Sequence, residues 1–173
     1  MMPEKSFFKT QVQKMGIKNC DKVIIYDQIG FFTSCRVWFT FKIFGHKEVL
    51  ILDGGLKNWI KRGLKITNQI STKKKSIYTV NFDKTKIKNK LEVRKAISKN
   101  EFLIVDARSE ERFKGKVEEP RKSVMKGTIP NSINIPFHKI FDREGFLLED
   151  KKLKEVFKVG KKIFEKNIIV SCG

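Results

Sequence analysis

The sequence predicts an α/β fold built on parallel sheets. Short apolar, β-branched runs alternate along the chain with stretches whose apolar residues recur at helical spacing. Several of these runs end at an aspartate, as at Asp27, Asp53 and Asp106. The chain has 173 residues, of which 40% are hydrophobic and 15 are phenylalanine, so it can bury the core that one medium or two small domains need.

The first half predicts helices and strands in alternation. Apolar residues of the stretch from Glu4 to Met15 recur at helical spacing, and Gly16 is well placed to end that helix. The elements expected after it are a strand at Val23–Tyr26, a helix at Ser34–Phe44 closed by Gly45, a strand at Val49–Leu52, and a short helix through Trp59.

A polar, lysine-rich connector follows and marks the best domain boundary. We expect a first domain at residues 1–66, a linker at 67–90 and a second domain at 91–173, with one strand at Ile77–Phe82 inside the connector. The elements expected in the second domain are a helix at Leu91–Ser98, strands at Phe102–Val105 and Ile133–Ile135, a helix at Leu153–Phe164, and a strand at Ile168–Ser171 that leads to Cys172.

The formal net charge of +19 could indicate a nucleic-acid partner. However, most of the excess is lysine, spread over the whole length, and no DNA- or RNA-binding motif accompanies it. We therefore favour a lysine-rich surface and expect no nucleic-acid partner. Retention on DNA or RNA that falls steeply with salt would favour the opposite interpretation.

Membrane, disulfide and metal functions have no sequence signal. No apolar run approaches the roughly 18–20 residues of a membrane span, and the N-terminus lacks the layout of a secretory signal, so we expect a cytoplasmic protein. Three cysteines, Cys20, Cys35 and Cys172, lie far apart and form no metal-ligand spacing. We expect neither a cofactor nor a metal.

Cys172 is the candidate nucleophile. It follows a predicted strand, and ligand sites in open α/β sheets lie just outside the carboxyl ends of strands. A following loop and helix would favour its thiolate over its thiol. The alternative, a strand-end cysteine that packs as a small hydrophobic residue, is equally compatible with this position.

Several motifs in order make the chain similar to a known family. They are Asp106-Ala107-Arg108, Arg112-Phe113, Glu119-Pro120-Arg121, Gly127-Thr128-Ile129-Pro130, Asn134-Ile135-Pro136 and Ser171-Cys172-Gly173. In these the chain resembles the catalytic domain of the 3-mercaptopyruvate sulfurtransferases, which are tandem-domain rhodaneses. The first half resembles the family's non-catalytic domain, with Asp27 at the place of the cysteine, and should be catalytically silent.

The resemblance implies an activity and a site. Cys172 would accept sulfane sulfur from 3-mercaptopyruvate or thiosulfate as a persulfide and pass it to cyanide or to a thiol such as thioredoxin. Arg112 and Arg121 would hold the substrate, as would Gly173, and a guanidinium suits this role because it can bind a carboxylate with two parallel hydrogen bonds. Asp106 and Arg108 would organise the loop. Without the resemblance, the favoured interpretation is that Arg112 and Arg121 are surface arginines paired with nearby glutamates.

The resemblance also implies that this chain is an internal part of a longer protein. Both rhodanese-like domains would be incomplete, and the active loop would continue past Gly173, so we expect the isolated chain to be weak or inactive. A non-enzymatic rhodanese-like binding or regulatory module is the main alternative.

Overall fold

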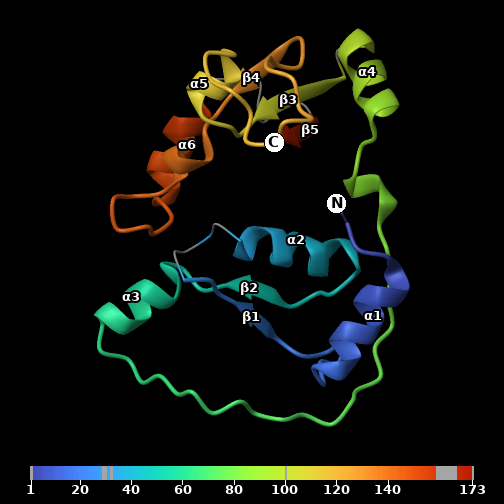
Figure 1. Cartoon of the computed structure of the whole chain (residues 1–173), viewed down its shortest axis with the longest axis vertical. Helices are drawn as coiled ribbons and strands as arrows, with labels where there is room; N and C mark the ends of the chain where they lie inside the picture. Colours follow the sequence, from blue (N-terminus) through green and yellow to red (C-terminus); the bar gives the residue numbers. More distant parts are fainter. Residues whose placement is uncertain (1, 29–30, 32, 100, 159–166, 173) are drawn as a thin grey trace. The chain divides into compact units, whose positions relative to one another are not determined.

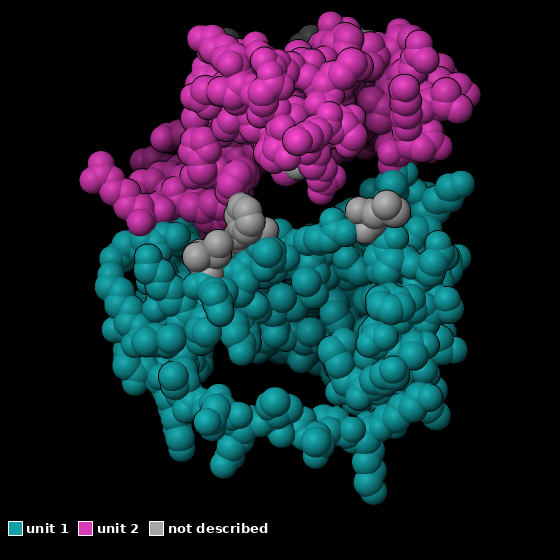
Figure 2. Space-filling model, viewed as in Figure 1, with its two compact units in different colours: residues 1–87, 144–146 teal, residues 88–143, 147–173 magenta. Residues whose placement is uncertain are grey.

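The chain divides into two compact units, each with its own sheet. A computed structural model describes residues 2–28, 31, 33–99, 101–158 and 167–172. One unit comprises residues 1–87 and 144–146, and the other comprises residues 88–143 and 147–173. Figure 1 traces the elements and Figure 2 colours the two units separately.

Unit 1 is a β-α-β arrangement with helices before and after it. Its elements are α1 (Lys5–Lys14), β1 (Val23–Ile25), α2 (Ser34–Ile43), β2 (Val49–Ile51), α3 (Gly55–Lys61) and the short 3₁₀ helix η1 (Lys84–Lys86). The strands β1 and β2 pair in parallel, with Ile24 opposite Leu50. A parallel pair needs a crossover connection, and α2 supplies it.

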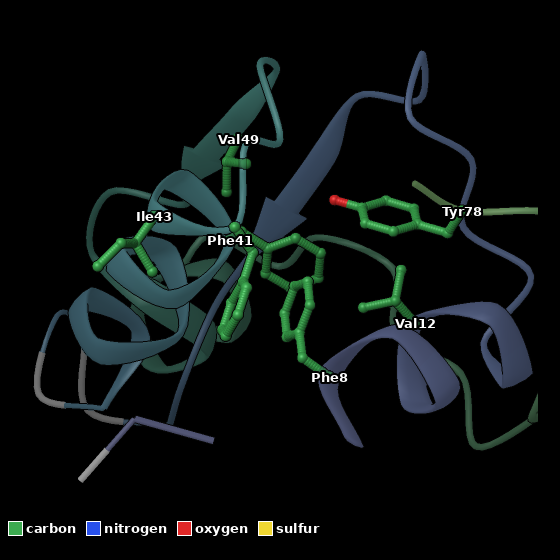
Figure 3. Packing of buried hydrophobic residues seen from close by; sticks show 7 residues of the cluster. Phe8, Val12, Phe41, Ile43, Val49 and Tyr78 are labelled. Atoms are coloured by element: carbon green, nitrogen blue, oxygen red, sulfur yellow. The ribbon is translucent and has the colours of Figure 1, made fainter. Parts of the chain in front are cut away.

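The core of unit 1 is aromatic. Phe8 of α1 stacks on Phe44 with ring centroids 4.2 Å apart, and it meets Phe41 edge to face at 5.3 Å. Figure 3 shows Phe8 and Val12 of α1 directed toward Phe41 of α2 and Tyr78. Phe8, Phe41 and Phe44 therefore join α1 to the end of α2, and Val49 of β2 belongs to the same buried cluster.

Residues 76–83 do not form the strand that the sequence predicts at Ile77–Phe82. The chain is extended there, but its amides bond to the ends of other elements rather than to a neighbouring strand. Ser76 N donates to Gln13 O at 3.0 Å, and Asn81 N donates to Phe44 O at 3.1 Å. This part of the connector packs on unit 1, in which Tyr78 is buried.

Unit 2 is built on a three-stranded parallel sheet. Its elements are α4 (Lys90–Lys99), β3 (Phe102–Asp106), α5 (Glu110–Phe113), β4 (Ser132–Asn134), the 3₁₀ helix η2 (Phe137–Ile140), α6 (Asp150–Phe157) and β5 (Asn167–Ser171). The strand order is β4-β3-β5, with β3 parallel to both neighbours. The predicted α/β class with parallel sheets is confirmed. The predicted helix at Leu153–Phe164 corresponds to α6, and residues 159–164 lie outside the described residues.

Both faces of the central strand are covered. Ile104 packs with Ala96 and Ile169 on one face, and Val105 packs with Ile135 on the other, as the alternation of side chains along a strand requires. A buried β3 holds its carboxyl end in a fixed position, next to the carboxyl ends of β4 and β5. Among the described residues, no helix is long and apolar enough to cross a membrane.

Candidate functional site at the carboxyl ends of β3, β4 and β5

Three strands of unit 2 end side by side, and Cys172 follows one of them directly. Asp106 at the end of β3 is the register partner of Ser171 at the end of β5, and Ala107 N donates to Ser171 O at 2.8 Å. Cys172 is exposed. The sheet therefore presents a solvent-accessible thiol at the edge where α/β proteins place their ligands.

Asn134, at the end of β4, closes this edge from the other side. Its side-chain Nδ2 donates to the backbone carbonyls of Asp106 and Arg108, at 2.9 Å each. It thereby fixes the chain where β3 turns into the following loop. The sequence did not predict this role; its only signal is a polar asparagine between the two isoleucines of the strand expected at Ile133–Ile135.

Asp106 and Arg108 form a buried ion pair directly after β3. The Asp106 carboxylate, with the residue 1% exposed, accepts hydrogen bonds from Arg108 N at 2.9 Å, Nε at 3.0 Å and Nη2 at 2.6 Å. These bonds raise the pKa of Arg108 above its ordinary value. Asp106 thus engages the backbone N, the Nε and the Nη2 of Arg108, so this pair fixes the start of the loop after β3.

Glu119 lies between two arginines. Its Oε1 accepts from Arg108 Nη1 at 2.7 Å, and its Oε2 accepts from Arg112 Nη2 at 2.5 Å and from Nε at 3.2 Å. Glu119 is only 8% exposed, and the hydrogen bond from Arg112 is the main reason that its pKa is lowered. Asp106, Arg108, Glu119 and Arg112 thus form one network with two positive and two negative charges.

Arg112 is the member of this network that reaches solvent. Its side chain is 20% exposed, against 9% for Arg108. Its partner Glu119 is one of the glutamates expected to form a surface ion pair, but the Glu119 carboxylate is buried. Arg112 is therefore held on its buried side, and part of its side chain remains exposed to solvent. The Nη1 atom of Arg112 makes no hydrogen bond to any described residue.

The other predicted substrate contacts are placed differently. Arg121 is exposed, and within the described part of the chain its side chain makes no hydrogen bond or ion pair. Gly173 lies outside the described residues. The structure therefore brings Asp106, Arg108 and Arg112 together through Glu119 and does not join Arg121 to them.

The loop after Glu119 is fastened by its backbone. Arg108 Nη2 donates to Gly127 O at 2.8 Å. Farther along, Asn131 has a φ of 62°, the left-handed conformation that asparagine tolerates better than most residues. The turn between Gly127 and β4 therefore contains an asparagine in the left-handed conformation.

In unit 1, Asp27 lies two residues after β1. Its Oδ2 accepts hydrogen bonds from Thr33 N at 2.7 Å and Ser34 N at 3.0 Å, so a carboxylate caps the start of α2. Burial and the charge of Asp27 raise the pKa of the Cys35 thiol, which disfavours a reactive thiolate there. The described residues contain no group of three or more His, Cys, Asp and Glu side chains placed to hold a metal ion.

The carboxyl edge of the unit 2 sheet thus carries an exposed cysteine and, from Asp106 onward, a buried arginine-carboxylate network in an α/β domain of parallel strands. The rhodanese-like domain family matches residues 1–62 and 89–173, and the chain belongs to this family.

Its relatives are sulfurtransferases. The chain is 32% identical to the 3-mercaptopyruvate sulfurtransferase of Mus musculus, over 100% of this chain and 59% of that protein. It is 30% identical to the thiosulfate sulfurtransferase of Gallus gallus, over 99% of this chain and 60% of that protein. The resemblance to sulfurtransferases that the motifs predict is confirmed.

Solved structures of sulfurtransferases have the same fold. The 3-mercaptopyruvate sulfurtransferase SseA of Escherichia coli superposes with a TM-score of 0.87 at 29% identity, over 100% of this chain and 64% of that one. The chain thus spans about three fifths of the length of the curated relatives it matches.

Proposed function

We propose that this chain carries the sulfur-accepting site of a sulfurtransferase, and that Cys172 is its nucleophile. The observation that supports this most strongly is the exposed thiol directly after β5, beside a charge-balanced network that leaves one edge of Arg112 open. The mouse and chicken relatives are named for two donors, 3-mercaptopyruvate and thiosulfate. The sequence identities of 32% and 30% are too similar to distinguish the two donors.

The reaction needs the thiolate, a bound donor and, for 3-mercaptopyruvate, a proton from solvent. The Cys172 thiolate attacks the sulfur of 3-mercaptopyruvate, an S–S bond forms, and the C–S bond breaks with its electron pair going to the methylene carbon. That carbon takes a proton, pyruvate leaves, and Cys172 holds a persulfide. With thiosulfate the leaving group is sulfite. A second thiolate, such as that of a thioredoxin, then takes the outer sulfur and restores the Cys172 thiolate.

Two arginines and the backbone after Cys172 would hold the donor. Arg112 offers the edge formed by Nη1 and Nη2, which fits a carboxylate or a sulfonate-like group with two parallel hydrogen bonds. Arg121 is exposed and free to turn toward the same anion, and Gly173 would supply a backbone N–H. Asp106 and Arg108 support the loop without touching the donor.

Sulfur loading of Cys172 tests this proposal without requiring full turnover, in which we expect the isolated chain to be weak. The chain is incubated with 3-mercaptopyruvate or thiosulfate, and intact-mass spectrometry follows the gain of one sulfur atom. We expect loading in the unsubstituted chain and none in Cys172→Ser.

The other two cysteines provide the matched controls. Cys20→Ser and Cys35→Ser should load like the unsubstituted chain, since neither thiol lies at the carboxyl edge of the unit 2 sheet. Loading that survives in Cys172→Ser would contradict the proposed nucleophile. A chain that takes no sulfur from either donor would instead favour the non-enzymatic binding module.

A further inference from the structure

The orientation of Arg112 is set by one carboxylate, and this determines which of its edges a ligand can reach. A guanidinium has two edges that can bind a carboxylate with two hydrogen bonds, one formed by Nε and Nη and one by the two Nη atoms. In this structure Nε and Nη2 both donate to Glu119 Oε2. The edge that carries Nη1 is therefore the one left for an incoming anion.

Glu119 can hold this orientation because it is itself fixed. Its second oxygen is bound by Arg108 Nη1, and Arg108 is anchored on Asp106 and on the carbonyl of Gly127. Its side chain is 2% exposed, so water does not compete for either oxygen. A carboxylate with both oxygens occupied and no exposure has one available geometry.

Glu119 also balances charge. The two arginines of the network are matched by Asp106 and Glu119, so an anion that reaches Arg112 meets a guanidinium whose charge is already partly compensated. Such an anion gains from directed hydrogen bonds more than from net charge. Recognition would then depend on how the guanidinium is aimed, which is the quantity that Glu119 controls.

We propose that Glu119 is a positioning residue that aims the Nη1–Nη2 edge of Arg112 at the carboxylate of the sulfur donor. The inference rests on the proposed function, because it assumes that Arg112 receives the donor anion. Glu119 touches neither the donor nor Cys172 in this role. It acts through Arg112 alone, so it should govern donor affinity and leave the transfer of sulfur to a bound donor unchanged.

The experiment measures the loading rate of Cys172 against the concentration of 3-mercaptopyruvate in Glu119→Gln. One of its two arginines would then face an amide N–H instead of an acceptor, and loss of a hydrogen bond to a charged group raises the half-saturating concentration by roughly tenfold or more. The maximal loading rate should stay within about twofold. Glu119→Asp keeps the charge and is expected to restore part of the affinity.

Glu118→Gln is the matched control. Glu118 is the neighbouring residue, it is exposed, and it pairs with Lys126 outside the network. Half-saturation in this variant should equal that of the unsubstituted chain. Circular dichroism of every variant checks the fold, and if Glu119→Gln does not fold, Glu119→Asp carries the test, with a severalfold rise in half-saturation expected.

Two further probes separate this inference from the proposed function. Inorganic polysulfide offers sulfur without a carboxylate, so it should load the unsubstituted chain and Glu119→Gln equally. Pyruvate, an unreactive carboxylate probe, should bind the unsubstituted chain in an NMR titration and bind Glu119→Gln more weakly. Unchanged half-saturation in both Glu119 variants would overturn the positioning role alone. A chain that loads from polysulfide but neither loads from 3-mercaptopyruvate nor binds pyruvate would overturn both.

Discussion

The two units differ in the residue that follows a strand: an aspartate, Asp27, after β1 of unit 1 and a cysteine, Cys172, after β5 of unit 2. In unit 1, Asp27 Oδ2 accepts hydrogen bonds from the backbone amides of Thr33 and Ser34. The start of α2, which attracts negative charge, is therefore already bound by a carboxylate of the chain. In unit 2, Cys172 follows β5, and the carboxylates of the site belong to Asp106 at the end of the neighbouring strand β3 and to Glu119 in the loop after α5. An aspartate cannot form a persulfide, so sulfur chemistry is expected in unit 2 alone.

Replacing Asp27 should therefore cost stability and not activity. Asp27→Ala removes the acceptor of three hydrogen bonds at the start of α2, including one from Thr33 Oγ1, and we expect a loss of about 1–2 kcal/mol. Trp38 and Trp59, the two tryptophans of the chain, both lie in unit 1, so tryptophan fluorescence during urea denaturation reports on this unit.

Two variants test the cause of that loss. Asp27→Asn keeps one acceptor oxygen and should fall between the unsubstituted chain and Asp27→Ala. Thr33→Val removes only the hydroxyl bond and should cost least. Equal stability of Asp27→Ala and the unsubstituted chain would show that the cap contributes nothing. Loading of Cys172 should be the same in all of these variants.

At the scale of elements, the sequence predicted what depends on local pattern. Among the described residues, the apolar runs predicted β1, β2, β3 and β5, because a strand of a parallel sheet is typically a continuous apolar stretch. The strand expected at Ile133–Ile135 lies one residue earlier in the structure, as β4. The segment 76–83 has a similar pattern but bonds to helix ends, a choice that only the tertiary fold makes. In the same way the Asp106–Arg108 pair spans two residues and could be expected, whereas Glu119 meets Arg108 through a loop whose path no local pattern fixes.

The extended segment 76–83 packs on unit 1 mainly through the buried side chain of Tyr78. Its ring stacks on that of His46, and its hydroxyl hydrogen bonds to His46 Nδ1 at 2.9 Å, while His46 Nε2 bonds to the carbonyl of Asp21. Tyr78→Phe leaves a buried ring nitrogen without its partner, so we expect a loss of about 1–3 kcal/mol in the free energy of unfolding of unit 1. Tryptophan fluorescence during urea denaturation measures it.

The loss of unfolding free energy at alkaline pH provides a second test of the role of Tyr78. Burial raises the pKa of Tyr78 to about 12. An unfolded tyrosine ionises near pH 10, so between pH 10 and about 12 only the unfolded state gains from releasing this proton, and stability falls as pH rises through that window. Tyr78→Phe should lack this part of the loss. Tyr26, the other tyrosine and an exposed one, supplies the control for the hydroxyl itself, because Tyr26→Phe should leave the free energy of unfolding unchanged.

At the scale of the whole chain, a large net charge opposes an exposed apolar surface. The charge of +19 makes copies repel one another. Against this, one face of the β1–β2 sheet carries Ile24 and Leu50 at 58% and 49% exposure. Beside them, a groove of about 490 Å³ is lined by Ile24, Tyr26, Leu52, Leu56, Trp59, Ile60, Lys65, Ile66 and Thr67. Such a surface favours association once the repulsion is screened.

Salt should therefore promote self-association of this chain. Charges interact over about 10 Å at 0.1 M salt and about 3 Å at 1 M, so screening weakens the repulsion while apolar contact is retained. We expect sedimentation velocity to show monomers at low salt and a rising share of dimers or larger species at high salt. An attraction between charged groups would give the opposite trend, with association at low salt only.

Substitution on the sheet face decides whether that face is responsible. Ile24 and Leu50 are register partners on neighbouring strands, so Ile24→Thr with Leu50→Thr removes two adjacent apolar side chains and places a β-branched residue, which suits a strand, at both positions. Each loss of apolar contact weakens association by about 1 kcal/mol, and together they should raise the dissociation constant at high salt by roughly tenfold or more. Ile70, 92% exposed and outside the groove, is the control, and Ile70→Thr should leave association unchanged. If both variants associate like the unsubstituted chain, the salt-dependent contact lies elsewhere on the surface, and the uncovered sheet is not what brings copies together.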